Sequence, residues 1–247
     1  MPREAADRFN SAGSHLERYS KVLNACEINS SFYRSHKHAT WERWASSVPA
    51  GFRFSVKAPK TITHESKLNC TPEPLSAFLQ QVRLLHDKAG PVLMQLPPSL
   101  KFEYAHARKF LSLLRESYLG DVVWEPRHDS WFSDEAGELL VEFQIARVAA
   151  DPACVPAAAC PAGLTSLVYF RLHGSPRRYY SAYSDEFLTA LADRLGQLAT
   201  RARIWCIFDN TASGHAMRNA LELTTKLKRI WTRGRARNSK ISSRLPK

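Results

Sequence analysis

The stretch ACEINSSFYR, residues 25–34, decides the fold of this chain. Its first half alternates like a β-strand, with Glu27 and Asn29 on one face and Cys26 and Ile28 on the other. Its second half is a polar and aromatic loop. Because burying an unpaired amide costs roughly 2–7 kcal/mol, we predict that the face with the carboxylate and the amide forms one wall of a polar site.

Length and composition indicate one α/β domain. The chain has 247 residues, 44% of them hydrophobic, and a single α/β barrel takes about 250 residues. No run of 18 or more apolar residues is present, so we expect no transmembrane helix. The opening MPREAADRF is unlike a signal peptide, which predicts a cytoplasmic location. Five scattered cysteines without a C-x-x-C pair argue against a disulfide scaffold or a zinc ribbon.

The positive charge is concentrated at the C-terminus. The net charge is +12, but residues 228–247 hold eight basic residues and no acidic one, which leaves +4 for residues 1–227. This final segment lacks apolar periodicity, as disordered segments do. We therefore predict a barrel domain over residues 1–227 and a basic, disordered tail over residues 228–247.

Segments with helical periodicity alternate with short apolar runs. Helices are predicted at 14–23, 39–47, 74–89, 104–118, 135–143, 185–199 and 215–227, and strands at the start of 25–34 and at 52–57, 92–96, 122–125, 145–150, 167–172 and 204–208. This order favours parallel strands joined by right-handed crossovers. The predicted fold is an α/β TIM-type barrel with seven recognisable strands, one fewer than a closed barrel needs. Residues 151–164 are predicted to form a structureless loop.

Polar residues of one parity gather near the C-terminal end of each predicted strand. They are Glu27, Asn29, Ser55, Lys57, Gln95, Glu125, Arg127, Asp151, Arg171, His173 and Asp209. In a barrel this face points inward, and the C-terminal mouth is where barrel enzymes hold their active sites. Structural ion pairs that plug the barrel are the alternative, but buried ion pairs stabilise poorly compared with an apolar fill. We therefore predict a ligand site.

Several segments together resemble the YecE-like domain-of-unknown-function family. They are ACEINSSFYR, PAGFRFSVKAPKTITH, VLMQLPPSL, VVWEPRHDSWF, VYFRLHG and WCIFDNTASGHAMRNAL, within residues 14–227. The resemblance implies a TIM-type barrel with a polar mouth, and no established reaction. Family members begin with a further strand and a glycine, serine and tryptophan turn. Because this sequence starts after that point, we expect an N-terminally truncated barrel with an exposed strand edge, and we interpret the segment after Arg229 as an extension.

The polar strand ends suggest acid–base chemistry. The predicted catalytic residues are Glu27, Lys57, Glu125, His173 and Asp209, with a glutamate as base and Lys57 or His173 as proton partner. The predicted substrate-binding residues are Asn29, Phe32, Tyr33, Gln95, Arg127, Arg171, Arg177, Tyr180, Asn210 and Thr211. Oxygen-rich ligation of Mg²⁺ or Mn²⁺ by the acidic residues stays open, but we assign no metal site because too few histidines follow the strands.

Two late loops suggest the substrate class. Residues 173–180 bring Arg177 and Arg178 close to two tyrosines, and residues 209–214 lead into a helix whose free N–H groups favour an anion. We therefore predict an enzyme for a phosphorylated or other anionic small molecule. The alternative is a non-catalytic nucleic-acid-binding module that uses the basic tail and rings at the mouth, namely Phe32, Tyr33, Trp124, Trp131, Tyr179 and Tyr180. The oligomeric state stays open.

Overall fold

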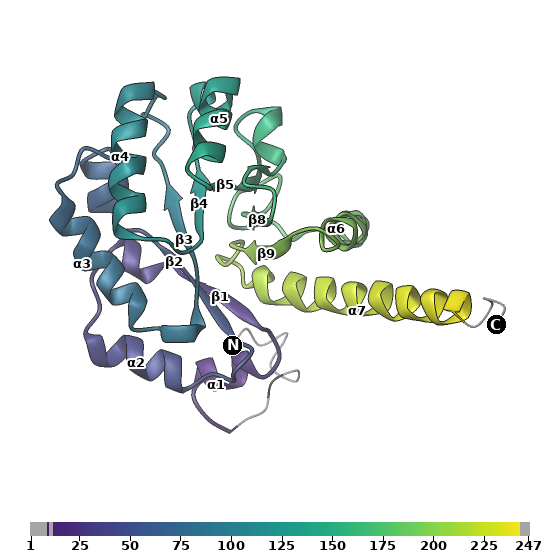
Figure 1. Ribbon diagram of the computed structural model, residues 1–247. Coiled ribbons are helices and arrows are strands. Elements are labelled where there is room, and N and C mark those ends of the chain that lie inside the picture. Colours follow the sequence, from purple (N-terminus) through teal and green to yellow (C-terminus); the bar gives the residue numbers. More distant parts are fainter. Residues whose placement is uncertain (1–8, 10–11, 243–247) are drawn as a thin grey trace.

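The computed structural model describes residue 9 and residues 12–242, with side chains to residue 232, and it shows strands alternating with helices (Figure 1). The strands are β1 (Ala25–Ile28), β2 (Arg53–Lys57), β3 (Ala89–Gln95), β4 (Val122–Glu125), β5 (Ala146–Arg147), β6 (Ala149–Asp151), β7 (Ala162–Gly163), β8 (Leu167–Leu172) and β9 (Arg203–Phe208). The helices are α1 (His15–Ser20), α2 (His38–Ser46), α3 (Pro72–Arg83), α4 (Tyr104–Ser117), α5 (Asp134–Glu142), α6 (Asp185–Leu198) and α7 (His215–Ser242). No described helix is long and apolar enough to cross a membrane.

The strands form two sheets that continue into each other, and nearly every described pairing is parallel. We call this combined sheet the wall. One sheet has the order β1-β2-β3-β4-β5-β7 and the other has the order β6-β8-β9. β5 and β6 are two halves of the strand predicted over 145–150, interrupted at Val148, whose N–H donates to the Trp124 carbonyl at 2.9 Å. Since β5 pairs with β4 and β6 pairs with β8, the wall continues across the break. Only β7 is antiparallel. The predicted α/β class is confirmed.

Apolar side chains pack on both faces of this wall. The largest cluster fills the space between the first strands and α2 to α5, and a second lies between β6, β8, β9 and the helices α6 and α7. A third, smaller cluster lies on the inner face and includes Leu93, Val123, Val148 and Tyr169. The inner apolar layer stops below the C-terminal ends of the strands. The polar side chains that follow it in each strand therefore lie directly above an apolar floor.

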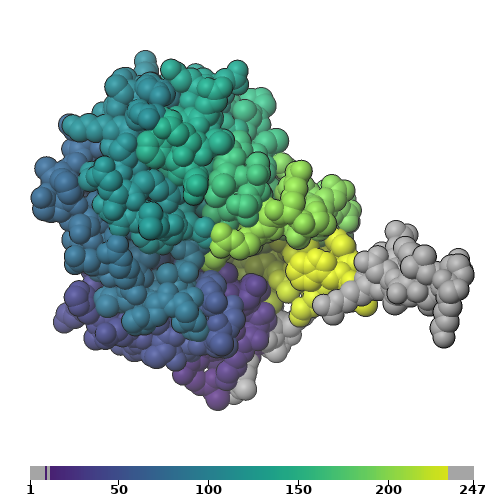
Figure 2. Space-filling view, in the orientation of Figure 1, coloured from purple at the N-terminus to yellow at the C-terminus, as the bar shows by residue number. Residues whose placement is uncertain are grey.

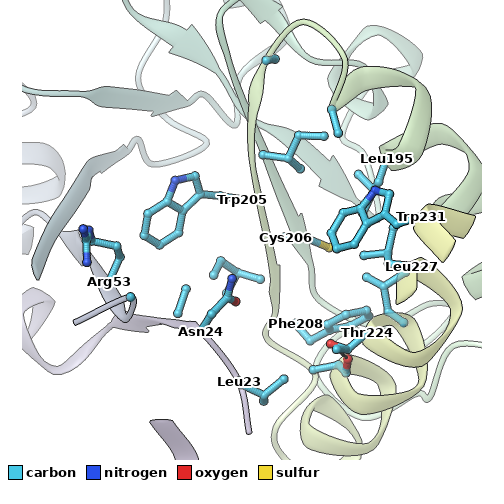
Figure 3. Close-up of a pocket in the computed structure, with 18 of the residues that line it drawn as sticks. Leu23, Asn24, Arg53, Leu195, Trp205, Cys206, Phe208, Thr224, Leu227 and Trp231 are labelled. Atoms are coloured by element: carbon cyan, nitrogen blue, oxygen red, sulfur yellow. Dashed lines mark hydrogen bonds between the residues drawn. The ribbon is translucent and has the colours of Figure 1, made fainter. Parts of the chain in front are cut away.

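The wall is open between its first and last strands. Among the described residues, β1 pairs only with β2, and β9 pairs only with β8. A cavity of about 430 Å³ lies at this opening (Figure 3). In that view Trp205 points toward Arg53, while Cys206 and Phe208 point toward α7. We call this opening the seam. The first elements of the chain and the start of α7 meet there, as the purple and yellow surfaces in Figure 2 show.

Two segments differ from the predictions. The loop predicted over 151–164 contains a helical turn (Pro156–Ala159) and β7, which is held in register by pairing with β5. The helix predicted to end at residue 227 continues to Ser242. Ile230 packs against the apolar cluster of α6 and α7 and extends the stripe of Leu223 and Leu227 by one turn, which the analysis of the tail missed. Residues 243–247 of the predicted tail lie outside the described residues.

Candidate active site

Arg171 lies at the centre of a buried charged network at the C-terminal mouth. It comes from the end of β8, and only 1% of its side chain is exposed. Its guanidinium contacts Glu27 at 2.6 and 3.0 Å, Glu125 at 2.7 Å and Asp209 at 3.3 Å. Burial alone would lower the pKa of Arg171, but Glu125 and Glu27 outweigh it and raise the pKa well above its usual value. One cation therefore holds three carboxylates that come from three different strands.

Glu125 is the most strongly held of these carboxylates. It ends β4, is 1% exposed, and also contacts Arg127 at 2.6 Å. Burial favours its neutral form, but Arg171 and Arg127 outweigh that effect and leave the pKa of Glu125 well below its usual value. Because Glu125 is 1% exposed and each of its oxygens contacts an arginine, it is not accessible to a substrate. In this arrangement Glu125 orients the two arginines, which differs from the role of base considered for it above.

His173 and Asp209 form a second pair beside Arg171. His173 is fully buried, and its Nε2 lies 2.9 Å from Arg127 Nη2 while its Nδ1 lies 3.1 Å from Asp209 Oδ2. Nε2 also lies 3.3 Å from Glu125 Oε1, so the ring contacts Arg127 and two carboxylates at once. The Asp209 side chain is 19% exposed. Burial acts to raise the pKa of Asp209, but His173 and Arg171 outweigh it and lower that pKa overall.

Tyr169 and Ser55 form the floor of the network. Ser55 was among the predicted inner-face residues, whereas Tyr169 was not predicted. The Tyr169 hydroxyl lies 2.8 Å from both Glu27 Oε2 and Ser55 Oγ. Burial, reinforced by Glu27, raises the pKa of Tyr169 well above its usual value, so the phenol stays protonated as a donor. The signal was present in the alternation of β8, where Leu167, Tyr169 and Arg171 share the inner face.

Lys57 differs from the other charged residues of the mouth. It ends β2, and its Nζ lies 4.0 Å from the ring centroid of Phe32. Among the described residues, no hydrogen-bond acceptor or carboxylate lies within bonding distance of Nζ. Burial and the nearby Arg171 lower the pKa of Lys57 to about 8, although Glu27, Glu125 and Asp209 act in the opposite direction. The pKa of Lys57 is therefore close enough to neutral pH for the side chain to act as a proton donor or as a nucleophile.

A second cavity connects the network to the seam. It has a volume of about 240 Å³, and its wall includes Glu27, Asn29, Asp209, Thr211 and Met217. The Asn29 Oδ1 atom is buried and has no hydrogen-bond partner in the described part of the chain. A buried amide oxygen without a partner is costly. The cavity wall thus combines two carboxylates, a hydroxyl and an acceptor available to a ligand.

The two loops predicted to bind an anion meet each other, and their first residues, His173 and Asp209, belong to the network. The Ala212 N–H donates to the Tyr179 carbonyl at 3.1 Å, which joins the loops. Arg177 stacks over Tyr180 at 4.0 Å, and both side chains are exposed at the surface. Asn210 is buried and donates to Ser181 and Asn219, as a structural residue would.

The remaining predicted residues divide between the mouth and the core. Phe32 lies under Lys57 at the mouth, while Tyr33 is 72% exposed beside it. Gln95 ends β3 in register with Glu125. Trp124 and Trp131 were expected at the mouth, but both are buried. They pack on each other at 5.4 Å in the cluster under α4 and α5, because Trp124 has the outward parity of β4.

Asp151 and the possible metal donors are the last polar groups considered above. Asp151 accepts from the Tyr183 hydroxyl at 2.7 Å and is absent from the contacts of Arg171. Within the described residues, no group of three or more His, Cys, Asp or Glu side chains is arranged to hold a metal ion. The acidic donors considered for Mg²⁺ or Mn²⁺ already surround the guanidinium of Arg171, whose charge would repel a cation at the same position.

The sequence matches one protein family and individual relatives. A family model described as "Protein of unknown function DUF72" matches residues 7–240, which includes most of the segment interpreted above as an extension. The "UPF0759 protein YecE" of Escherichia coli K12 is 32% identical over 82 residues, a match that covers 33% of this chain and only 30% of that relative. The "UPF0759 protein YunF" of Bacillus subtilis is 24% identical over 242 residues and 84% of each chain.

Solved structures agree with the fold described above. A DUF72 family protein from Thermotoga maritima is 29% identical, with a TM-score of 0.75 over 85% of this chain and 87% of that one. Another, from Enterococcus faecalis, is 21% identical, with a TM-score of 0.77 over 91% and 92% of the two chains, and shows likeness of fold alone. The expected resemblance is confirmed by the family match, and the chain belongs to the DUF72 family.

Proposed function

We propose that this protein is an enzyme that acts on a phosphorylated or otherwise anionic small molecule at the C-terminal mouth, with Lys57 and Asp209 as the proton-transfer pair. The observation that carries this proposal is that the network buries charged side chains at a cost in folding free energy. The side chains of Glu27, Glu125 and Arg171 are each 1% exposed, and together they would stabilise the fold less than a well-packed apolar cluster. A network of this kind is typical of sites that hold fixed charges for a ligand.

The proposal divides the predicted catalytic residues by their accessibility. Three of them have side chains that are at most 1% exposed and are held by Arg171 and Arg127, namely Glu27, Glu125 and His173. We call these five residues the frame, because they hold fixed charges around the accessible residues. Lys57 and Asp209 remain accessible from the mouth and the smaller cavity. Fixed dipoles and charges around an accessible acid and base are what proton transfer requires.

The anionic character of the substrate is supported by the positive groups in and beside the frame. Lys57 lies at the mouth, and the start of α7 borders the smaller cavity through Met217. Arg127 is 7% exposed and paired with Glu125, but its Nε atom has no hydrogen-bond partner among the described residues. Helix N-termini and arginine side chains are the usual partners of phosphate and carboxylate groups. An anionic substrate would also provide Lys57 with the negative partner that it lacks.

The experiment is a turnover screen with matched variants. The purified chain is tested against a panel of sugar phosphates, nucleotides and carboxylic acids, with product detected by mass spectrometry. Wherever turnover is found, we expect Asp209→Asn to reduce kcat/KM by at least about 100-fold, in the range for loss of a general acid or base. Asp193→Asn, on the exposed part of α6, is the control and should leave turnover unchanged. Equal turnover in both variants would refute the assigned role of Asp209.

We also propose that the wall is a TIM-type barrel with one strand position open at the seam. The seven parallel positions, the inner apolar floor and the polar mouth support this interpretation. Amide hydrogen exchange tests it, because the outward N–H groups of Glu27 in β1 and Cys206 in β9 should exchange faster than that of Phe170 in β8. Slow exchange at both edges would mean that another segment pairs with them.

A nucleic-acid-binding module is the second candidate. It is favoured by the exposed Arg177–Tyr180 stack and by the basic residues Lys228 and Arg229 on α7. If it is correct, replacing Lys228 and Arg229 with glutamine should weaken binding to a fluorescent oligonucleotide and flatten its salt dependence. An unchanged affinity and slope would remove α7 from this account. The cytoplasmic location predicted above belongs to both proposals.

A further inference from the structure

Lys57 has an environment that acid–base chemistry alone does not require. Its ammonium lies against the face of Phe32 and has no carboxylate within ion-pair distance in the part of the chain that the structure describes. The carboxylates that could have paired with it are held by Arg171. The fold therefore keeps an amine at the mouth while directing the nearby negative charges away from it.

We propose that Lys57 is a nucleophile that forms an imine with the aldehyde or ketone group of an anionic substrate. This inference rests on the proposed function and names the substrate class of the same site. A lysine that is desolvated and placed next to another cation is the usual form of an imine-forming amine. Phe32 supplies the apolar surface and Arg171 supplies the neighbouring cation.

The reaction balances with groups that are present at the mouth. The neutral Nζ attacks the carbonyl carbon, a C–N bond forms as the C=O π bond breaks, and one proton passes from nitrogen to oxygen to give a neutral carbinolamine. The second proton passes from nitrogen to the hydroxyl group, the C–O bond breaks with release of water, and the C=N bond forms. No oxidant or reductant is needed. Asp209, hydrogen-bonded to His173 and open to the smaller cavity, is placed to exchange these protons.

The pKa of Lys57 supports the same step. With a pKa of about 8 instead of 10.5, the fraction of neutral amine at pH 7 is higher than that of an ordinary lysine by on the order of 10²-fold. Lys60, three residues further along, is an internal reference because it pairs with Glu65 at 2.8 Å and its pKa is raised. The two lysines should therefore differ sharply in reactivity toward the same carbonyl compound.

Reductive trapping tests the proposal on the full chain. The protein is incubated at pH 7.5 with glyceraldehyde 3-phosphate or dihydroxyacetone phosphate and sodium cyanoborohydride, and the adducts are located by peptide mapping. We expect Lys57 to be modified at least about 10-fold faster than Lys60 and the other lysines. The rate should rise with pH and level off near the pKa of about 8. In Lys57→Arg the adduct should be lost, while Lys60→Arg should retain it.

The outcomes separate this inference from the proposed function. Modification spread over surface lysines, or no enrichment at Lys57 with either probe, would overturn the imine, whatever the folding of the variants, because the wild-type map is sufficient. If Lys57 is not trapped but Asp209→Asn still abolishes a turnover found in the screen, the proposed enzyme stands and the imine fails. Selective trapping at Lys57 that Asp209→Asn slows would support both.

Discussion

Replacing Arg171 with methionine should expose how much of the fold depends on the charged network. The substitution keeps a long side chain at a position that is 1% exposed, but it leaves Glu27 without its guanidinium partner and Glu125 with Arg127 and His173 as its remaining charged contacts among the described residues. Removing one partner of a buried ion pair costs about 3–5 kcal/mol. We expect the free energy of unfolding at pH 7 to fall by about that amount, measured by urea denaturation followed by circular dichroism.

The pH dependence provides the sharper part of this test. In the wild type the pKa of Glu125 is well below its usual value, so its stabilising effect is present above the unfolded pKa of about 4.5 and is lost as pH falls through the lower folded value. Without Arg171, burial should raise the pKa of Glu125 above the unfolded value. The folded variant would then bind protons between pH 7 and pH 5, and its deficit should shrink over that range while the wild type changes little.

Arg203 provides the matched control. It pairs with Asp121 at 2.7 Å, but 66% of its side chain is exposed. Exposed pairs contribute about 0–1 kcal/mol, so Arg203→Met should remain near wild-type stability at both pH values. A loss below about 1 kcal/mol for Arg171→Met at pH 7, or a deficit that does not change between pH 7 and pH 5, would refute this account of the network.

Three further substitutions test separate parts of the structure. Lys57→Met should raise the free energy of unfolding at pH 7, because burial disfavours the charged amine; the gain should disappear above about pH 10.5, where the unfolded lysine is also neutral, and a loss at pH 7 would contradict the desolvation argument. Asn219→Ala should lower the free energy of unfolding in urea by about 2 kcal/mol, since the Asn219 Oδ1 accepts from the Tyr183 N–H and from Asn210 Nδ2. A decrease below about 0.5 kcal/mol would be too small for a buried, hydrogen-bonded amide. Ser14→Ala should cost about 1 kcal/mol through loss of the capping box of α1, and a Ser14→Asp variant should restore the stability.

Much of the fold could be predicted from apolar periodicity and from the residues that begin and end helices and strands. The helix predicted over 14–23 is present as α1, where Ser14 and Glu17 form a capping box, and the strand predicted over 122–125 matches β4. These signals are local, because a cap or a short apolar run is defined by neighbouring residues. The end of α7 was less accessible, since one apolar turn at Ile230 packs on α6 and nothing in the local pattern distinguishes it from a polar tail.

The site could be predicted as a set but not as a geometry. Strand parity placed Glu27, Glu125, Arg171 and Asp209 at one mouth, and the structure brings them into contact. Strand parity could not predict that Arg171 would bind all three carboxylates and leave Lys57 without a carboxylate partner. That distribution depends on contacts between strands far apart in the sequence. Parity failed for Trp124, because an apolar ring is compatible with either face of a strand.

NMR mapping of anion binding tests the central claim most directly. Backbone amide shifts of the isotopically labelled protein are followed while inorganic phosphate, glyceraldehyde 3-phosphate or a short oligonucleotide is added. If the mouth is the ligand site, the phosphorylated compound should shift Asn29, Lys57, Asp209 and Thr211, and Arg127→Gln should weaken that response. Shifts confined to Arg177, Tyr180 and α7, or no saturable shift at the mouth with any of the three, would contradict the account.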